Sequence, residues 1–191
     1  KRVVMACPTA RAATVLAETV GEPASTIHRL LEYNPHEGVW KRDHRTPLQT
    51  DAIVIDEASM LDLPLAARLL DALPERCSVL IVGDKDQLPS VGPGAVLTDL
   101  LQCSRVPRVV LDQVFRQDPS GDIARNAALV NAGRPPQYLR RLDDSSNEVE
   151  RPTGCVIIEA ADEQGAAEWI CGGVLDWLSD GGYDLRSEVQ V

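Results

Sequence analysis

Short, continuously apolar runs alternate with segments of helical pattern along the chain. The apolar runs of strand length fall at residues 1–8, 52–55, 78–82 and 108–111. The segments of helical composition fall at residues 11–20, 26–31, 63–73 and 95–101. Strands that are apolar throughout, and that are separated by helices, are typical of a parallel sheet covered on both faces. The pattern therefore predicts an α/β fold.

Capping residues support several of these helix boundaries. Gly21 directly follows the first helical segment, where a C-terminal glycine is common. Ser25 or Thr26 can cap the second segment, and Pro64 suits the first turn of the third. The charged, turn-forming stretch at about 38–48 predicts an exposed loop or a small hairpin insertion.

The charge balance changes near residue 117. Residues 1–116 carry 13 Lys and Arg against 15 Asp and Glu, whereas residues 117–191 carry 6 against 14. Further elements are expected in the second segment: helices at 123–131 and 163–178, a loop at 135–154, and strands at 155–159 and 188–191. These differences predict two domains, at 1–116 and 117–191.

Composition narrows the class of protein. The 191 residues are 44% hydrophobic and 25% charged, which is typical of a folded globular chain. Apolar runs are too short for a membrane span, so we expect no membrane partner. The five cysteines form no C-x-x-C pair, which disfavours a disulfide framework and a thiolate zinc site and indicates a cytoplasmic protein. The net charge of −10 lowers the expectation of a nucleic-acid partner without excluding one, since a basic groove can lie on an acidic body.

Candidate chemistry lies where the predicted strands end. Asp56 and Glu57 directly follow residues 52–55, and Asp84 and Gln87 follow residues 78–82. Open parallel sheets bind ligands at this edge. One carboxylate there can hold Mg²⁺, and its neighbour can take a proton from an attacking water. Strand-end acids that are merely solvated, and a turn capped by Asp84, are the simpler interpretations.

Three further candidates are more ambiguous. Arg116 follows the run at 108–111, where a guanidinium can stabilise charge on a transferring phosphoryl group, but it also fits an ordinary surface arginine. Trp40 stands in the charged stretch with Lys41, Arg42, His44 and Arg45. It can stack on a base or pack back onto the core. The three histidines, His28, His36 and His44, fall on different predicted elements, which disfavours a metal cluster.

Together the segments CPTARAA, TIHRLL, VIDEASM, VGDKDQLPSVGPGAVL and VFRQ closely resemble RecD-like superfamily 1B DNA helicases. That family includes the exodeoxyribonuclease V alpha subunit. The resemblance spans residues 3–133 and implies a P-loop NTPase (RecA-like) fold with ATP and Mg²⁺ as ligands. It implies that Asp56 coordinates Mg²⁺ and Glu57 polarises the hydrolytic water. It also implies that Gln87, after Asp84, senses the terminal phosphate, and that Arg116 contacts this phosphate.

The same resemblance implies contacts with single-stranded DNA. Pro8, Thr9 and Arg11 match one contact segment, and Thr26 with His28 matches a second. In relatives, the insertion that carries Trp40 is a pin that helps to separate the duplex. The family's usual glycine after Pro-Thr is alanine in this chain, at residue 10.

The sequence has no G-x-x-x-x-G-K-[ST] segment to hold the phosphates. The resemblance places that loop just before residue 1, so we expect a middle fragment of a motor, truncated at both ends, with little hydrolysis of its own. Residues 117–191 would begin a second RecA-like domain. The implied parent is an ATP-dependent 5′-to-3′ DNA helicase of recombination and repair. Its expected partners are single-stranded DNA, duplex junctions and, in some relatives, nuclease-complex subunits.

Two other functions fit the same segments. One is a DNA-repair ATPase that does not unwind duplexes. The other is a catalytically silent module that binds DNA or a protein partner on a motor scaffold, with the acidic second segment as a docking surface.

Overall fold

The computed structural model describes residues 1–111, 121–137, 140–142, 156–182 and 184. The chain divides into two compact units, Lys1–Val110 and Leu111–Val191, which we describe separately.

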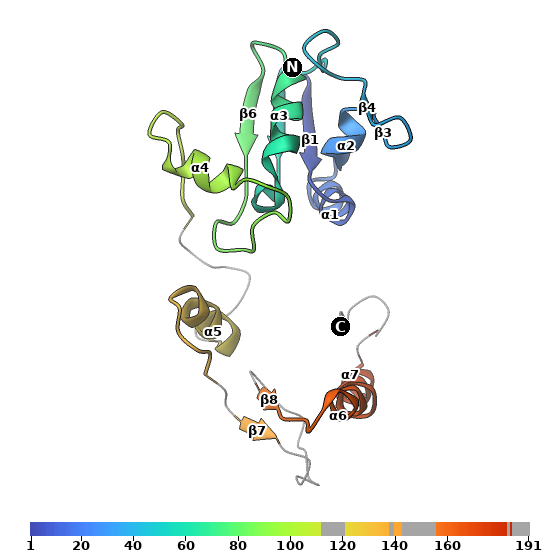
Figure 1. Ribbon diagram of the computed structural model, residues 1–191, viewed down its shortest axis with the longest axis vertical. Coiled ribbons are helices and arrows are strands. Elements are labelled where there is room, and N and C mark those ends of the chain that lie inside the picture. The colour runs from blue at the N-terminus through green and yellow to red at the C-terminus, as the bar shows by residue number, and fades with distance from the viewer. Residues whose placement is uncertain (112–120, 138–139, 143–155, 183, 185–191) are drawn as a thin grey trace. The chain divides into compact units, whose positions relative to one another are not determined.

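Unit 1 is built on a parallel sheet of four strands (Figure 1). They are β1 (Val3–Cys7), β2 (Ala24–Thr26), β5 (Ala52–Ile55) and β6 (Ser78–Ile81), in the spatial order β2-β1-β5-β6. All three pairings are parallel, and Ile55 lies opposite both Ala6 and Ile81. The predicted α/β fold with a parallel sheet is therefore confirmed, and it agrees with a RecA-like domain.

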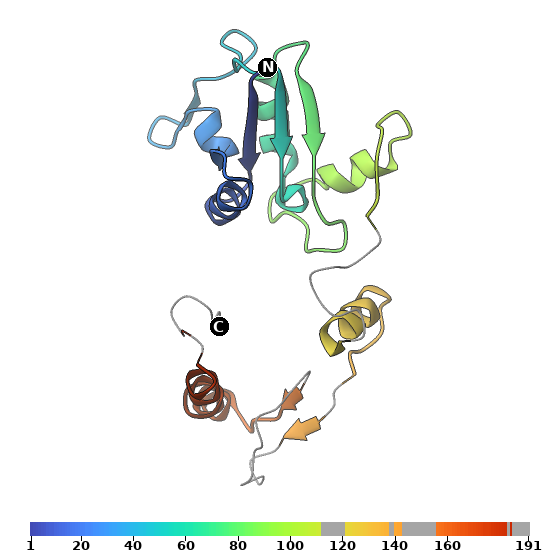
Figure 2. The same cartoon turned by 180° about the vertical axis from the view of Figure 1, so that it is seen from behind.

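Four helices lie close to the predicted segments. They are α1 (Ala10–Val20), α2 (Ile27–Leu30), α3 (Leu63–Asp71) and α4 (Val96–Gln102), and an additional 3₁₀ turn, η1 (Ala58–Met60), was not predicted. Seen from opposite sides, α3 lies over one face of the sheet (Figures 1 and 2). Helix α3 buries Leu65, Ala66 and Leu69, and these join Ile53 and Ile55 of β5 in one core cluster.

The predicted ends at Gly21, Thr26 and Pro64 are confirmed, and Thr9 is a further cap. Gly21 ends α1 at φ 75°, and at the start of that helix the hydroxyl oxygen of Thr9 accepts a hydrogen bond from Ala12. The hydroxyl of Thr26 accepts from Arg29 in α2. Asp62, which the sequence analysis did not single out, caps α3 beside Pro64.

Three predictions about unit 1 need correction. Strand β2 was not expected. The hairpin is β3 (Tyr33–Asn34) paired antiparallel with β4 (Val39–Trp40), which is earlier than the expected insertion at 38–48. The strand expected at 108–111 is absent, and the side chains of Val109, Val110 and Leu111 are 86%, 62% and 90% exposed. An apolar run forms a strand only where it can pair with the edge of another strand.

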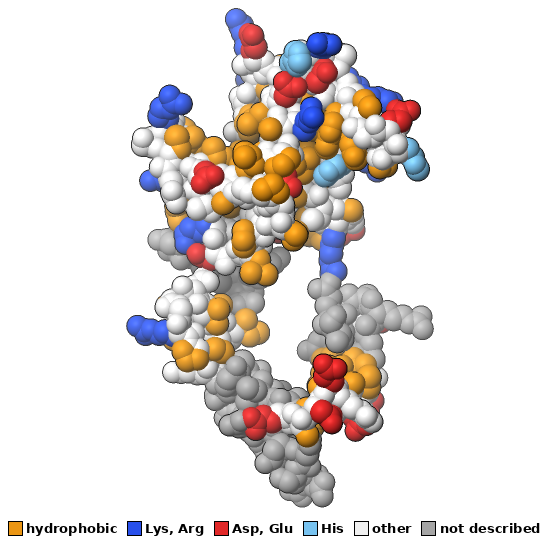
Figure 3. Space-filling view, viewed as in Figure 1, with side chains coloured by type: hydrophobic (Ala, Val, Ile, Leu, Met, Phe, Trp, Pro, Cys, Tyr) orange, Lys and Arg blue, Asp and Glu red, His pale blue; other side chains and the backbone are white. Residues whose placement is uncertain are grey.

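The outer edge of β6 is open within the described residues, because β6 pairs only with β5 there. Val79 and Leu80 on this strand are 42% and 57% exposed. Other apolar side chains gather on the face that carries α3 (Figure 3), where Leu63 and Leu70 are both 59% exposed. Unit 1 thus combines a buried core with open apolar surface.

Unit 2 contains α5 (Asp122–Asn131), the strands β7 (Arg140–Leu142) and β8 (Val156–Ile158), and the helical run α6 (Glu163–Glu168), η2 (Trp169–Val174) and α7 (Leu175–Asp180). β7 and β8 pair in parallel, and β7 falls within the loop expected at 135–154. The helix at 163–178 is interrupted by the π-helical turn η2. The strand expected at 188–191 lies outside the described residues. No helix in the described ranges is long and apolar enough to cross a membrane.

Candidate functional site

The chain turns sharply where β5 delivers its two carboxylates. The N–H of Asp56 still donates to Ala6 of β1 at 3.0 Å, and Asp56 Oδ1 then accepts the N–H of Glu57 at 2.9 Å. The backbone of Glu57 has a left-handed conformation, with φ 55° and ψ 39°. A non-glycine residue in this region costs about 1–3 kcal/mol, and such strain gathers at functional sites. The turn therefore holds Glu57 in a fixed direction at the edge of the sheet.

The end of β6 is fastened to this turn. Val82 donates to Ile55 at 2.8 Å and accepts from the N–H of Ala58 at 3.0 Å. A Cβ on Gly83 would lie 3.0 Å from the backbone nitrogens of Ala58 and Ser59, so any larger residue there would crowd this backbone. The strand ends that carry Asp56 and Asp84 thus form one connected piece of backbone.

Gln87 follows in a short turn beyond Gly83. Asp84 Oδ1 accepts the N–H of Asp86 at 2.9 Å, and the carbonyl of Asp84 accepts the N–H of Gln87 at 3.3 Å. The structure therefore contains the Asp84-capped turn. Gln87 itself is exposed, as a group that contacts a ligand must be.

The other predicted contacts lie along the same edge of the sheet. Pro8 and Thr9 join β1 to α1, and Thr26 ends β2 and begins α2, next to His28. Because the four strands are parallel, these residues, the Asp56–Glu57 turn and the Asp84–Gln87 turn all stand at the strands' carboxyl ends. Arg11 lies in the first turn of α1. Arg116 lies outside the described residues.

Both capping threonines still have a hydroxyl proton to donate. Each uses its hydroxyl oxygen as an acceptor, from Ala12 in one case and Arg29 in the other. A hydroxyl that accepts a hydrogen bond also carries a proton that it can donate. Thr9 and Thr26 are therefore held in place by the helices they cap, with an O–H group suited to a phosphate oxygen.

Trp40 packs back against the core, which was one of the two placements predicted for it from the sequence. Its ring centroid lies 4.4 Å from that of Tyr33 and 5.2 Å from that of His28. Trp40 and His28 form one wall of a hollow of about 210 Å³, which is lined by His28, Trp40, Asp62, Pro64, Leu65 and Arg68.

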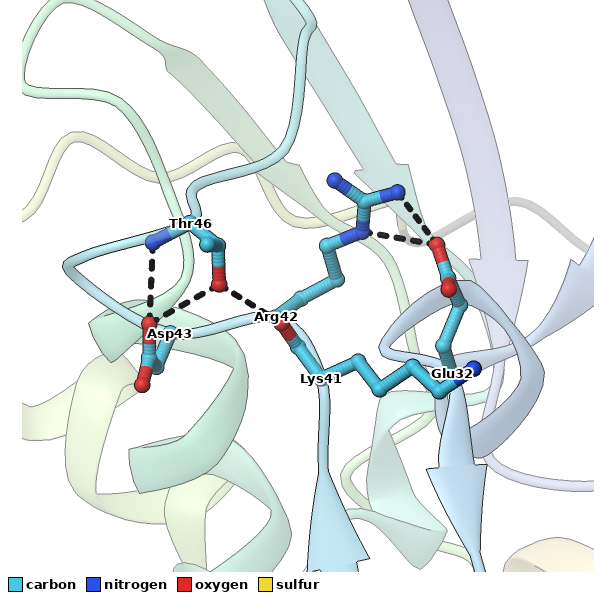
Figure 4. Close-up of polar contacts among 5 residues, drawn as sticks. All are labelled: Glu32, Lys41, Arg42, Asp43 and Thr46. Atoms are coloured by element: carbon cyan, nitrogen blue, oxygen red, sulfur yellow. Dashed lines mark hydrogen bonds and ion pairs between the residues drawn. The ribbon is translucent and has the colours of Figure 1, made fainter.

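The basic stretch after Trp40 is an ordered turn (Figure 4). Arg42 pairs with Glu32, and its Nε lies 2.7 Å from Oε1 of that residue. Asp43 Oδ1 accepts the N–H groups of Arg45 and Thr46, both at 2.9 Å. These hydrogen bonds, with that of Thr46 first, lower the pKa of Asp43. The cations in this stretch are thus carried on a fixed backbone.

Cys7 is fully buried at the end of β1. Burial raises the pKa of its thiol to about 11, and the nearby charge of Asp56 adds to the rise. The thiol is therefore neutral near pH 7 and adds no charge beside the two carboxylates.

Residues 1–150 match the family described as AAA domain. The ATP-dependent RecD2 DNA helicase of Deinococcus radiodurans is 39% identical over 136 residues, which is 71% of this chain and 18% of that protein. The RecBCD enzyme subunit RecD of Mycolicibacterium smegmatis is 41% identical over 118 residues, which is 53% of this chain and 21% of that protein.

The chain belongs to the RecD-like superfamily 1 helicases of the AAA domain family. A more distant relative is the ATP-dependent DNA helicase dda of phage T4, 34% identical over 97 residues, which is 48% of this chain and 22% of that protein. The RecD-like chain spans about a fifth of the length of these relatives.

Two residues of this candidate site were not predicted from the sequence. Asp62 lines the hollow and caps α3. The hydroxyl of Ser59 is buried and has no hydrogen-bond partner among the described residues. The D-E-A-S order puts Ser59 two positions after Glu57, but nothing in that order indicates burial. The sequence does contain a signal for Asp62: an aspartate directly before a helix that begins Leu-Pro is a typical N-cap.

Proposed function

We propose that the gene product containing this chain is an ATP-dependent DNA helicase that moves 5′-to-3′ along single-stranded DNA in recombination and repair. The observation that carries the proposal is the junction of the Asp56–Glu57 turn with the Gln87 turn through Ala58, Val82 and Gly83. A carboxylate carried on a strained backbone and an exposed amide then stand on one edge, beside two hydroxyl-bearing helix caps.

The residues of this edge fit ATP and Mg²⁺ by their chemistry. Mg²⁺ in phosphate sites takes one or two carboxylates and fills its other positions with water and phosphate oxygens, and Asp56 supplies a carboxylate. The described residues contain no cluster of three or more His, Cys, Asp or Glu, and such a cluster is not needed. When bound, the metal ion neutralises charge on the phosphates.

Each side chain then has a role. Glu57 accepts a proton from the attacking water, held in direction by its turn. The side-chain N–H of Gln87 donates a hydrogen bond to an oxygen of the terminal phosphate, and Asp84 fixes the turn that presents it. Arg116 stabilises the developing charge, an effect of roughly 10³–10⁵ in rate for such an arginine.

On the nucleic-acid side, Pro8, Thr9 and Arg11 contact the strand backbone at one helix start. Thr26 and His28 contact it at the next. Trp40 offers an aromatic face beside His28, and stacking of a base contributes about 1–3 kcal/mol. The partners we propose are single-stranded DNA and duplex junctions.

Residues 117–191 would open a second motor domain, and the gene product would act in the cytoplasm. Parallel β7 and β8 with neighbouring helices support this domain proposal. The relatives include both a RecD2 helicase and subunits of RecBCD enzymes, so nuclease-complex subunits are proposed as further partners.

The test is ATP hydrolysis by the intact gene product with and without a single-stranded oligonucleotide. Glu57→Gln should lower stimulated hydrolysis by about 10²–10⁴ while ATP binding is retained, since a general base contributes that much. Glu32→Gln is the matched control, because Glu32 is also a left-handed glutamate, at φ 52°. It should leave hydrolysis within about twofold, since Glu32 pairs with Arg42 and belongs to neither the Asp56–Glu57 turn nor the Asp84–Gln87 turn. Full turnover in Glu57→Gln would remove Glu57 from its role.

A further inference from the structure

The loop that carries Gln87 has a second anchor, at the start of α3. The N–H of Leu63 donates to the carbonyl of Pro93 at 2.9 Å. The hydroxyl of Ser90 lies 3.0 Å from the carbonyl oxygen of Gly92 and 3.1 Å from that of Gly94. The far end of the loop is therefore shaped by its own hydrogen bonds and tied to the helix.

The two segments approach each other closely at this anchor. A Cβ on Gly92 would lie 2.1 Å from Oδ2 of Asp62 and 2.8 Å from its Cγ. A Cβ on Gly94, at φ 100°, would lie 2.6 Å from Cβ of Leu63. Two glycines thus let the backbone of the loop rest directly on Asp62 and Leu63.

Asp62 also belongs to the hollow that Trp40 and His28 line. Its Oδ1 accepts the N–H of Leu65 at 2.8 Å and so holds the first turn of α3. Leu65 and Arg68 of the same helix line the hollow as well. One side chain therefore contacts the phosphate-side loop and forms part of the wall shared with the aromatic group.

We propose that Asp62 is a positioning residue that couples the Gln87 loop to the aromatic hollow, so that the state of the loop alters the grip on a single nucleic-acid strand there. This inference rests on the proposed function. A displacement of the Gly92 end of the loop changes its contact with Asp62 directly, because the backbone at Gly92 rests on the Asp62 carboxylate and the Leu63 N–H is bonded to Pro93. Moving Asp62 disturbs the cap of α3 and with it the wall formed by Leu65 and Arg68.

The test measures the ratio of hydrolysis with saturating oligothymidylate to hydrolysis without it, in the intact gene product. Asp62→Ala should lower this ratio at least about fivefold, the lower end of typical coupling between sites. Asp62→Asn retains an oxygen that can cap Leu65 and should restore most of the ratio. Ser90→Ala removes only the hydroxyl that shapes the far end of the loop, so it should lower the ratio by about twofold. It keeps the proposal testable if Asp62→Ala does not fold.

Thr19→Ala is the matched control, since it removes a hydroxyl bound to a carbonyl, that of Val15, on α1. It should leave the ratio unchanged. A merely structural role for Asp62 would lower both rates in proportion and leave the ratio intact, which would overturn the proposal. A parent protein with no stimulation by the oligonucleotide would overturn the proposed function itself, and the two failures are thus distinguishable.

Discussion

The N–H of Ala58 donates a hydrogen bond of 3.0 Å to the carbonyl oxygen of Val82. This contact joins the turn after β5 to the end of β6, so the carboxylates and the Gln87 loop rest on one support. The two segments can approach this closely because the residue directly after Val82 is Gly83, which has no side chain.

Gly83→Ala should therefore destabilise unit 1. The new Cβ would meet backbone nitrogens at 3.0 Å and the Cδ2 atom of Leu97 at 2.9 Å, and backbone cannot give way cheaply. We expect a loss of about 1–3 kcal/mol in the free energy of unfolding, as for other overpacked sites. Urea denaturation followed by circular dichroism measures it. Gly38→Asn is the control, because Gly38 has φ 66° and open space around it, and asparagine tolerates that backbone. Equal losses in the two variants would contradict the steric argument.

Glu57→Gly should stabilise the fold while it abolishes hydrolysis. Glycine adopts the left-handed backbone of residue 57 without strain, although it also gains freedom in the unfolded chain. We expect a net gain of about 0.5–1 kcal/mol in the free energy of unfolding. Glu32→Gly, also at positive φ, should gain less because it loses the ion pair with Arg42. A lower melting temperature for Glu57→Gly than for the parent would show that the turn is not strained.

Thr26→Asp should separate capping from strand binding. Aspartate is at least as good an N-cap as threonine, so the free energy of unfolding should stay within about 0.5 kcal/mol of the parent. The negative charge repels phosphate and the side chain has no proton to donate, so oligonucleotide affinity should fall about tenfold or more. Fluorescence anisotropy of a labelled oligonucleotide measures it. Thr26→Ser keeps both functions and should resemble the parent. Unchanged affinity in Thr26→Asp would exclude Thr26 from strand contact.

The Cys7 thiol should resist alkylation in the folded protein. Its pKa of about 11 and full burial leave almost no accessible thiolate at pH 8. Exposed Cys171 should react first with N-ethylmaleimide, as mass spectrometry of the peptides would show. The raised pKa also means that the folded state holds the thiol proton more tightly than the unfolded state. The corresponding stability is present below pH 9 and declines as the pH rises from 9.0 towards about 11. Rapid labelling of Cys7 in the folded chain would contradict the burial.

The sequence predicted best where local signals and the fold agree. The apolar run at 52–55 becomes β5 with the same bounds, and the caps Thr26 and Gly21 stand where their residue types indicate. Because parallel strands end at one edge, the placement of Asp56 and Asp84 there followed from the strand predictions alone.

What the sequence missed depends on neighbours in space. Ala24–Thr26 is too short and too polar to signal a strand, and it becomes one by pairing with β1. The run at 108–111 has the composition of a strand, but its side chains are exposed and no strand forms. The contact between Gly92 and Asp62 joins two distant segments, and no local pattern specifies it.

The open edge of β6 bears on how the chain behaves at high concentration. A row of backbone N–H and C=O groups flanked by the apolar side chains of Val79 and Leu80 is a template on which another strand can add. Two copies of this chain can meet there edge to edge and continue the sheet between them. Since β6 has no second partner strand among the described residues, we expect self-association through this edge when the isolated chain is concentrated.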